Sequence, residues 1–288
     1  MTAVHTAPVA APTHRLSHRP WGLYVAGLLA VLLAVLLALA AIAPQLLATH
    51  DPLALDYGHP LGGPSWANWF GTDESGRDLY SRVIFGARES LLIGLGAAGV
   101  GIVLSLILGS VAALAVKPAA VVVDRFVEVM FAFPALLLAL LLIAIAGPSA
   151  LTEIFAVGLG TAPGYARMIR GQILAARNSG YVEAATALGH SRARIIGAHI
   201  LPNALRPLVA VFALSVGQSI VWASSLSFLG LGVAPPSSEW GALLDAGRGY
   251  ITEAGWLEVV PGLVIVTVAL SATTIGRHLQ AHLEKGEK

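Results

Sequence analysis

The chain has 288 residues, of which 56% are hydrophobic and only 11% are charged, and its mean hydropathy is +0.77. This composition excludes an ordinary soluble domain and indicates an integral membrane protein. The net charge of +1 says little about partners, and the absence of cysteine excludes disulfides, thiolate metal sites and cysteine nucleophiles. No lysine completes a Gly-Lys-Ser/Thr phosphate-binding loop, so the chain carries no ATP site of the usual kind.

The N-terminal region is predicted to contain a tail and a first membrane span. Residues 1–20 are rich in Ala, Pro, Thr and His, which is typical of a disordered segment. A charge-free run from Trp21 to Ala43 follows, and it is long enough to cross a bilayer. Residues 41–43 resemble a signal-peptidase site, but the run exceeds a signal-peptide core of roughly 7–15 residues, and Pro44 follows the cut. We therefore predict a retained span.

An extracytoplasmic segment is expected from Pro44 to Arg88, because it is polar, rich in Gly and Pro, and contains Trp66 and Trp69. Within it, residues 71–78 read Gly-Thr-Asp-Glu-Ser-Gly-Arg-Asp. Clustered acids suggest calcium, but the EF-hand spacing and its late Glu are missing. A turn that leads into a helix is the better prediction.

Three further spans are predicted in the next part of the chain. The second, from Ser90 to Val116, has glycines spaced for close helix packing. The third, about Val127 to Ala146, contains Pro134, which predicts a kink. The fourth runs from about Leu151 to Met168 and could continue as a helix towards Gln172.

The segment from Ser179 to Pro207 is basic and helix-prone. Ser179 could cap a helix whose first turn holds Glu183, apolar residues recur at helical spacing, and Pro202 stops the pattern. Gly189 is expected inside that helix, where glycine costs about 1 kcal/mol relative to alanine, so another surface should pack closely on its backbone. Because membrane spans flank it, this segment is predicted to be an amphipathic helix offered to a soluble partner.

The fifth span, about Leu208 to Leu229, carries our candidates for a translocation path, which are Ser215, Gln218, Ser219 and Trp222. Serines in membrane helices also hold helices together, and the sequence does not decide between the two roles. A polar outer loop (residues 237–256), a sixth span (about Leu257 to Ile275) and a short charged tail complete the chain.

The distribution of lysine and arginine predicts six spans with both termini in the cytoplasm. Of the 17 basic residues, 13 then lie inside and four lie outside, namely Arg77, Arg82, Arg88 and Arg248.

The positions of ionisable residues indicate which energy source would drive transport. No carboxylate, histidine or basic residue lies near the centre of a predicted span, whereas transporters coupled to protons or sodium usually need such sites. The sequence thus favours an external energy source over a secondary transporter, and a non-transporting membrane scaffold is the other alternative. His278 and His282 could share a metal but lack a third ligand. We therefore expect no metal, no cofactor and no catalytic residue.

The basic segment also carries a family resemblance. Residues 183–185 (Glu-Ala-Ala), Gly189 and the ending Ile200-Leu201-Pro202 resemble the EAA loop of bacterial ABC-importer permeases, although His199 stands where the general pattern has Ile. The His-Ile-Leu-Pro-Asn form of residues 199–203 is similar to the dipeptide/oligopeptide/nickel branch of that family.

Two distant stretches, residues 71–78 and 225–241, are similar to the same branch, and the chain is identified as a C-type permease subunit of it. The terminal segment departs from the pattern. Residues 273–280 stand where the branch has Asn-x-x-Gly-Asp-x-x-Arg, so no family role is carried over to them.

The resemblance implies an all-α membrane protein with the type I ABC-importer permease fold. It divides the chain into a cytoplasmic tail (1–20), a first transmembrane helix with an extracytoplasmic segment (21–85), and a permease core (86–288). That core holds five transmembrane helices and the EAA loop (about 179–207). Such a subunit is a non-catalytic, multi-pass protein of the bacterial inner membrane.

The family also implies partners and a role. The subunit forms half of a pathway for peptides or related small solutes, pairs with a second homologous permease in a heterodimer, sits on two ATPase subunits and receives substrate from an extracytoplasmic binding protein. Nucleic acid is not a partner, and the substrate stays open among dipeptides, longer peptides, nickel chelates and metallophores. The residues implied to couple to the ATPase are Glu183, Ala184, Ala185, Gly189, Arg192, Leu201 and Pro202.

Overall fold

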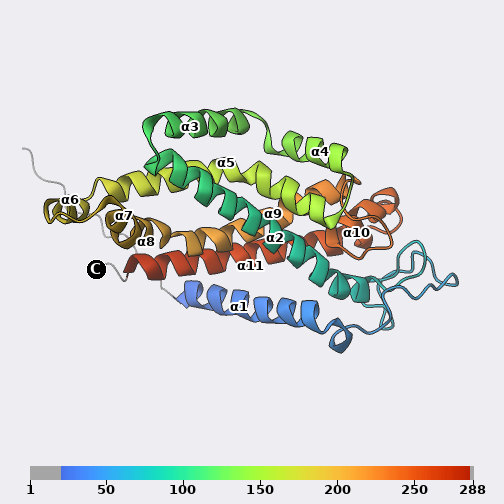
Figure 1. Cartoon of the computed structure of the whole chain (residues 1–288). Coiled ribbons are helices and arrows are strands. Elements are labelled where there is room, and N and C mark those ends of the chain that lie inside the picture. The colour runs from blue at the N-terminus through green and yellow to red at the C-terminus, as the bar shows by residue number, and fades with distance from the viewer. Residues whose placement is uncertain (1–20, 286–288) are drawn as a thin grey trace, which may run out of the picture.

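A computed structural model describes residues 21–285, and over that range the chain is helical apart from loops and one isolated bridge between Thr72 and Asp78. The predicted tail, residues 1–20, lies outside the described residues, as does the side chain of His282. The long helices form an elongated bundle, with α6, α7 and α8 at one end and α10 and the loop before α2 at the other (Figure 1).

The first part of the chain is α1 (Trp21–Ile42), a short η1 (Pro44–Leu46), an irregular segment and α2 (Leu79–Leu114). The predicted turn into a helix at residues 71–78 is confirmed, since Gly71 and Gly76 have φ of 80° and 75°. Helix α2 begins at Leu79 rather than near Ser90, because the Asp78 side chain accepts the backbone N–H of Ser81 at 2.8 Å and caps the helix there.

The third predicted span is a broken one. Helix α3 (Lys117–Ala132) and helix α4 (Ala135–Ala146) meet at an angle of 91°. The break falls at Pro134, so the predicted kink is confirmed; proline has no backbone N–H to continue the helical ladder. Helix α5 (Ala150–Arg177) then runs past its predicted end and tolerates Pro163 within it.

The basic segment is not one helix, contrary to the prediction. It is divided into four short elements, α6 (Gly180–Ala187), α7 (Arg192–Ile195), the π-helical η2 (Ile196–Ile200) and α8 (Leu201–Leu205). Gly189 lies outside any helix, with φ of 77°, where it ends α6 in the left-handed conformation that glycine favours. Pro202 does not stop the helical pattern, because α7, η2 and α8 follow one another without a gap and Pro202 lies within that stretch. The Ser179 hydroxyl donates to Ala176 O at 2.5 Å and does not cap α6.

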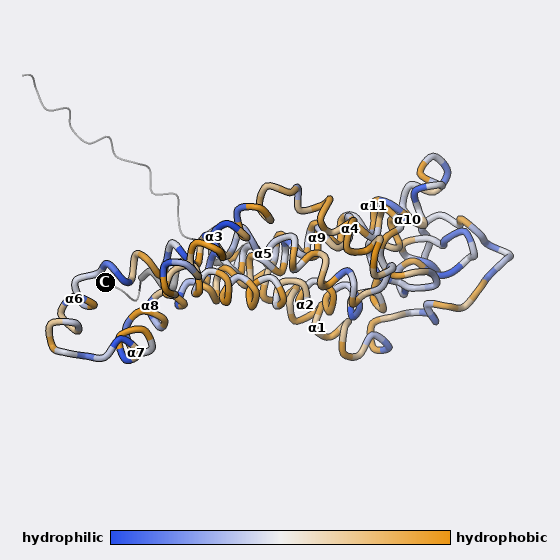
Figure 2. The backbone as a smooth tube through the Cα atoms, turned by 45° about the horizontal axis from the view of Figure 1, so that its top comes forward, coloured by the Kyte–Doolittle hydropathy of each residue, from blue (hydrophilic) through white to orange (hydrophobic). Residues whose placement is uncertain are grey.

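The last part contains α9 (Leu208–Phe228), α10 (Trp240–Gly247), η3 (Arg248–Tyr250) and α11 (Trp256–Lys285). Within the described range, three helices (α2, α9 and α11) are long and apolar enough to cross a membrane, or four if the bent pair α3–α4 is one span. Hydrophobic residues dominate the middle of the bundle, and hydrophilic residues gather towards its two ends (Figure 2).

Small residues let the central helices approach closely. A Cβ at Gly109 of α2 would lie 2.7 Å from Ala166 O of α5, and a Cβ at Gly217 of α9 would lie 2.8 Å from Ala269 O of α11. Helix α2 therefore packs against α5 and α9, and α9 packs against α11. Helices α3 and α4 cover one side of this core, and α1 lies on the opposite side beside α11 (Figure 1).

Candidate functional site

A cavity of about 550 Å³ lies where the α3–α4 break meets α5 and α9. The cavity exists because α3 and α4 diverge at Pro134, and this divergence leaves Phe131 and Phe133 more than half exposed. The residues that line the cavity are Met130, Phe131, Phe133, Pro134, Ala135, Gly160, Thr161, Pro163, Gly164, Tyr165, Met168, Gln218 and Trp222. None of them is charged, so the cavity offers aromatic rings, thioethers and a few neutral polar groups.

One hydrogen bond crosses this cavity. Tyr165 of α5 donates its hydroxyl to Oε1 of Gln218 of α9 at 2.8 Å. Gln218 is exposed, and its amide N–H₂ donates to none of the described residues. An amide with free donors beside aromatic rings suits a ligand that has carbonyl oxygens and apolar side chains.

The predicted path residues fall on two faces of α9. Gln218 and Trp222 line the cavity, whereas Ser215 and Ser219 are 1% exposed and lie away from it. The Ser215 hydroxyl donates to Phe212 O of its own helix at 2.8 Å. The structure thus brings only two of the four candidates together.

Sequence reasoning did not single out Tyr165 and the other residues that α3 and α5 contribute. Two local signals pointed towards this place, the proline at position 134 and the Gly160, Pro163, Gly164 cluster in α5. The Tyr165–Gln218 pair joins residues 53 positions apart, so no local pattern could reveal it.

Charged residues flank the cavity on its α6 side without lining it. Arg167 stacks over the Phe131 ring, with its guanidinium carbon 4.0 Å from the ring centroid. One turn further along α5, Arg170 forms an ion pair with Asp124 of α3 at 2.8 Å. These contacts hold α3 against α5.

The elements α6 to α8 present a surface at the end of the bundle. Val182 and Ala185 of α6 are buried against the core, and this leaves the other face of the helix open. On that face Tyr181 is 43% and Leu188 is 77% exposed. These two apolar side chains are therefore available for contact from outside the subunit.

Of the predicted coupling residues, Glu183, Ala184, Gly189, Arg192 and Pro202 are exposed, Leu201 is half-buried, and Ala185 is buried. Nothing in the described chain lies within 4 Å of a Cβ built on Gly189, so no surface of this subunit requires glycine there. Its conformation requires glycine instead, because Gly189 N–H and His190 N–H donate to Thr186 O at 3.0 Å and Ala185 O at 3.1 Å and close the helix end.

Two arginines tie this end of the bundle to α2. Arg192 donates to Leu114 O at 2.7 Å, and Arg177 donates to Ala113 O at 3.4 Å. These carbonyls belong to the last turn of α2, where the helix dipole favours a positive charge. Arg192 therefore links α7 to the end of α2.

The other end of the bundle holds a buried ionic clamp, formed by Asp73, Arg77 and Arg82. Asp73 accepts from Arg82 at 2.5 Å and from Arg77 Nε at 2.6 Å, and both Asp73 and Arg82 are nearly inaccessible. Arg82 also donates to Ser237 O at 2.9 Å, in the loop before α10. Two of the three acids that suggested calcium, Asp73 and Glu74, are thus engaged with arginines, and Asp78 caps α2 instead. Through Arg82, the clamp fastens the loop before α2 to the loop before α10.

Two buried carboxylates lie at this same end of the bundle, on α5 and at the start of α10. Glu239 accepts from the Ser90 hydroxyl at 3.0 Å and from Ala242 N–H at 2.8 Å. Glu153 accepts from the Ser227 hydroxyl at 3.0 Å, and its second oxygen has no hydrogen-bond partner among the described residues. The pair links α2, α5, α9 and α10 through polar contacts.

Several known proteins are similar to this chain in sequence. The family model described as binding-protein-dependent transport system inner membrane component matches residues 101–287. The probable D,D-dipeptide transport system permease protein DdpC of Escherichia coli K12 is 38% identical over 247 residues, which cover 86% of this chain and 83% of the relative. The di/tripeptide transport system permease protein DppC of Pseudomonas aeruginosa UCBPP-PA14 is 35% identical over 301 residues, with 99% and 98% covered.

Solved structures share the fold. A crystal structure of an amino acid ABC transporter with histidines matches with a TM-score of 0.58 at 18% identity, covering 70% of this chain and 94% of that one. An inward-facing MetNI methionine ABC transporter matches with a TM-score of 0.57 at 19% identity, covering 70% and 95%. At these identities the likeness concerns the fold alone.

Proposed function

Because the chain belongs to the family of binding-protein-dependent transport system inner membrane components, we propose that it forms half of the membrane pathway of an ATP-driven importer of short peptides. It is a non-catalytic permease subunit of the bacterial inner membrane and crosses that membrane several times. The observation that carries the assignment of the pathway is the neutral cavity at the α3–α4 break, with the Tyr165–Gln218 hydrogen bond across it.

The proposed topology has six spans, formed by α1, α2, the bent pair α3–α4, α5, α9 and α11, with both termini in the cytoplasm. The clamp of Asp73, Arg77 and Arg82 then lies outside, and α6 to α8 lie inside. Because the chain has no cysteine, single cysteines at Ser75 and Ser191 can be labelled from either side of the membrane. We expect an impermeant maleimide to reach position 75 from outside and position 191 only after permeabilisation. The reverse pattern would refute this orientation.

The proposed partners follow from the exposed surfaces. A second, homologous permease would complete the pathway across the cavity, and the binding protein would deliver substrate at the outer end. The two permeases would sit on two ATPase subunits, one of which would dock at α6 to α8 of this chain. Tyr181 and Leu188 project there, and Glu183, Ala184 and Gly189 lie on the same segment. When ATP draws the ATPase subunits together, α6 and α7 would move with them, and Arg192 would carry that motion to α2.

Peptides are the proposed substrates because the relatives named above carry dipeptides and tripeptides. The cavity suits them. Its amide and hydroxyl groups can bond to a peptide backbone, and flexible Met130 and Met168 can adapt to different side chains. The absence of charged lining disfavours a metal ion that lacks a chelator.

The test is uptake of a labelled dipeptide by cells that lack this chain and carry it back on a plasmid. Gln218→Leu removes the amide that faces the cavity and should reduce uptake roughly tenfold, the usual effect of losing about one hydrogen bond to a ligand. Ser219→Ala, on the buried face of the same helix, is the matched control and should leave uptake near wild type. No dipeptide uptake with the wild-type chain would reject the substrate class, and equal uptake by both variants would reject the cavity as the path.

A further inference from the structure

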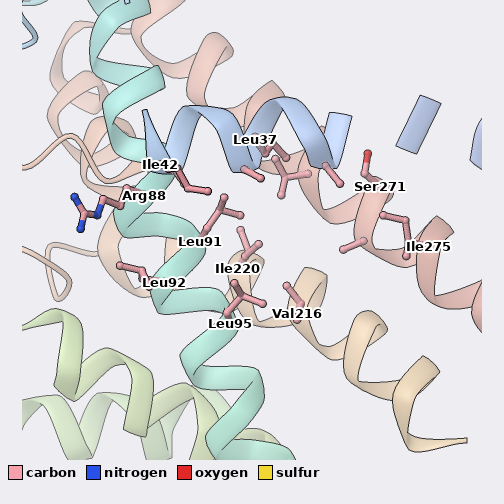
Figure 3. A pocket seen from close by; sticks show the side chains of 15 residues that line it. Leu37, Ile42, Arg88, Leu91, Leu92, Leu95, Val216, Ile220, Ser271 and Ile275 are labelled. Carbon is pink, nitrogen blue, oxygen red and sulfur yellow. The ribbon is translucent and has the colours of Figure 1, made fainter. Parts of the chain in front are cut away.

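A second hollow lies on the far side of the bundle from the proposed pathway. It has a volume of about 620 Å³ and lies between α1, α2, α9 and α11, whereas the pathway cavity lies between α3–α4, α5 and α9 (Figure 1). Its walls are almost entirely aliphatic, with Leu37 of α1, Leu92 and Leu95 of α2, and Val216 of α9 among them (Figure 3). Leu92 and Leu95 are 59% and 45% exposed, so the hollow is an open groove and not a closed core.

One cation stands at the end of this apolar groove. Arg88 projects beside Ile42, the last residue of α1, and Arg88 is exposed (Figure 3). It makes no hydrogen bond or ion pair with any described residue, and the carboxylate next to it, Glu89, accepts instead from the Ser237 hydroxyl at 2.6 Å. The charge of Arg88 is therefore free for a ligand from outside the chain.

The depth of Arg88 in the membrane follows from helix length. The rest of α2, from Ser90 to Leu114, has no charged residue, and at 1.5 Å per residue it is about 37 Å long. The hydrocarbon core of a bilayer is about 30 Å thick, so Arg88 falls at the level of the lipid headgroups. With the proposed orientation this is the outer leaflet, where phosphates stand next to acyl chains.

We infer that this groove binds one anionic phospholipid of the outer leaflet, with its phosphate on Arg88 and an acyl chain between α1 and α9. A guanidinium matches a phosphate with two parallel hydrogen bonds, and the aliphatic walls match the chain. The groove volume lies within the range of about 300–1,000 Å³ that is usual for small-molecule sites. Helix α1 packs on α11 and α2, so the lipid would fill the space that α1 leaves open towards α9. The inference uses the proposed orientation but not the proposed substrate.

Native mass spectrometry of the purified transporter, released from membranes that contain phosphatidylglycerol, tests the inference. We expect a wild-type adduct with the mass of phosphatidylglycerol, and the mass separates a phospholipid from free phosphate. Arg88→Gln should lower the retained lipid roughly tenfold, because the charge-assisted hydrogen bonds are lost. Arg248→Gln removes another exposed arginine of the outer end, one that pairs with Asp245 and does not line the groove, so this control should retain the adduct.

Two further measurements keep the inference falsifiable if a variant assembles poorly. Leu92→Trp fills the groove without altering the charge and should also remove the adduct. The wild-type transporter in detergent should gain thermal stability with added phosphatidylglycerol and much less with phosphatidylcholine of the same chains. Equal retention by Arg88→Gln and wild type, or an equal response to both lipids, would overturn the inference. A disulfide from Leu95→Cys to a cysteine in the second permease would also overturn it, because protein would then occupy the groove.

Discussion

Gly189 offers the sharpest test of how the surface of α6 to α8 is built. Its φ of 77° is costly for an L residue with a side chain, by roughly 1–2 kcal/mol, and asparagine tolerates this conformation best. A Cβ would meet nothing within 4 Å, so crowding adds no cost within this subunit. Gly189→Ala should therefore weaken the end of α6 by about 1 kcal/mol, and Gly189→Asn should weaken it less.

The assay is hydrogen exchange at the His190 amide, which donates to Ala185 O at 3.1 Å and closes the helix end. A loss of about 1 kcal/mol speeds exchange roughly fivefold in Gly189→Ala, while Gly189→Asn should stay close to wild type. Unchanged exchange in Gly189→Ala would refute the reasoning from conformation. Uptake and co-purification with the ATPase add the second step. If the partner packs on this backbone, Gly189→Asn should fail in both measurements although its helix end is intact.

The remaining predictions concern the two ends of the bundle and the source of energy. Arg192→Gln loses the charged hydrogen bond to Leu114 O, and we expect normal ATPase binding but slower uptake; equal losses of both would show that Arg192 contacts the partner. Asp73→Asn leaves buried Arg82 without its counter-charge and should destabilise the fold by about 3–5 kcal/mol, seen as a lower melting temperature than in Glu74→Gln, which removes only a more exposed partner of Arg77. Uptake should persist when the proton gradient is collapsed at constant ATP, and its loss would favour secondary transport.

Local chemistry made much of the helical framework predictable. Charge-free runs marked the apolar helices, and Pro134 marked the break, because a missing N–H acts on its own helix whatever surrounds it. The predicted start of α2, at Ser90, was too late. The first residues of this helix are polar, so they were assigned to the preceding segment and the cap at Asp78 was not recognised. Gly189 was misplaced because glycine is compatible with a helix interior and with a helix end, and only the φ angle distinguishes them.

The site was less accessible to sequence reasoning. Gln218 and Trp222 were among four candidates chosen within about two turns of one span, whereas Tyr165 reaches Gln218 from another helix. At residues 71–78 the sequence predicted the turn that leads into α2 but not the clamp, since it shows the acids together without showing that Asp73 pairs with Arg82. Pairings of this kind depend on tertiary structure, and residue spacing alone does not determine them.

Helix α2 connects the parts of the molecule that transport would need to coordinate. It has 36 residues and is about 54 Å long, so it reaches from the clamp of Asp73, Arg77 and Arg82 at one end of the bundle to the elements α6 to α8 at the other. Arg82 fastens its first turn to the loop before α10, and Arg192 fastens its last carbonyl to α7. Between these ends, Gly109 packs it directly on α5, which carries Tyr165 of the cavity. A rigid helix held at both ends and packed on the cavity wall cannot shift at one end without moving the other, so we expect α2, rather than the broken α3–α4 pair, to transmit the motion of the ATPase.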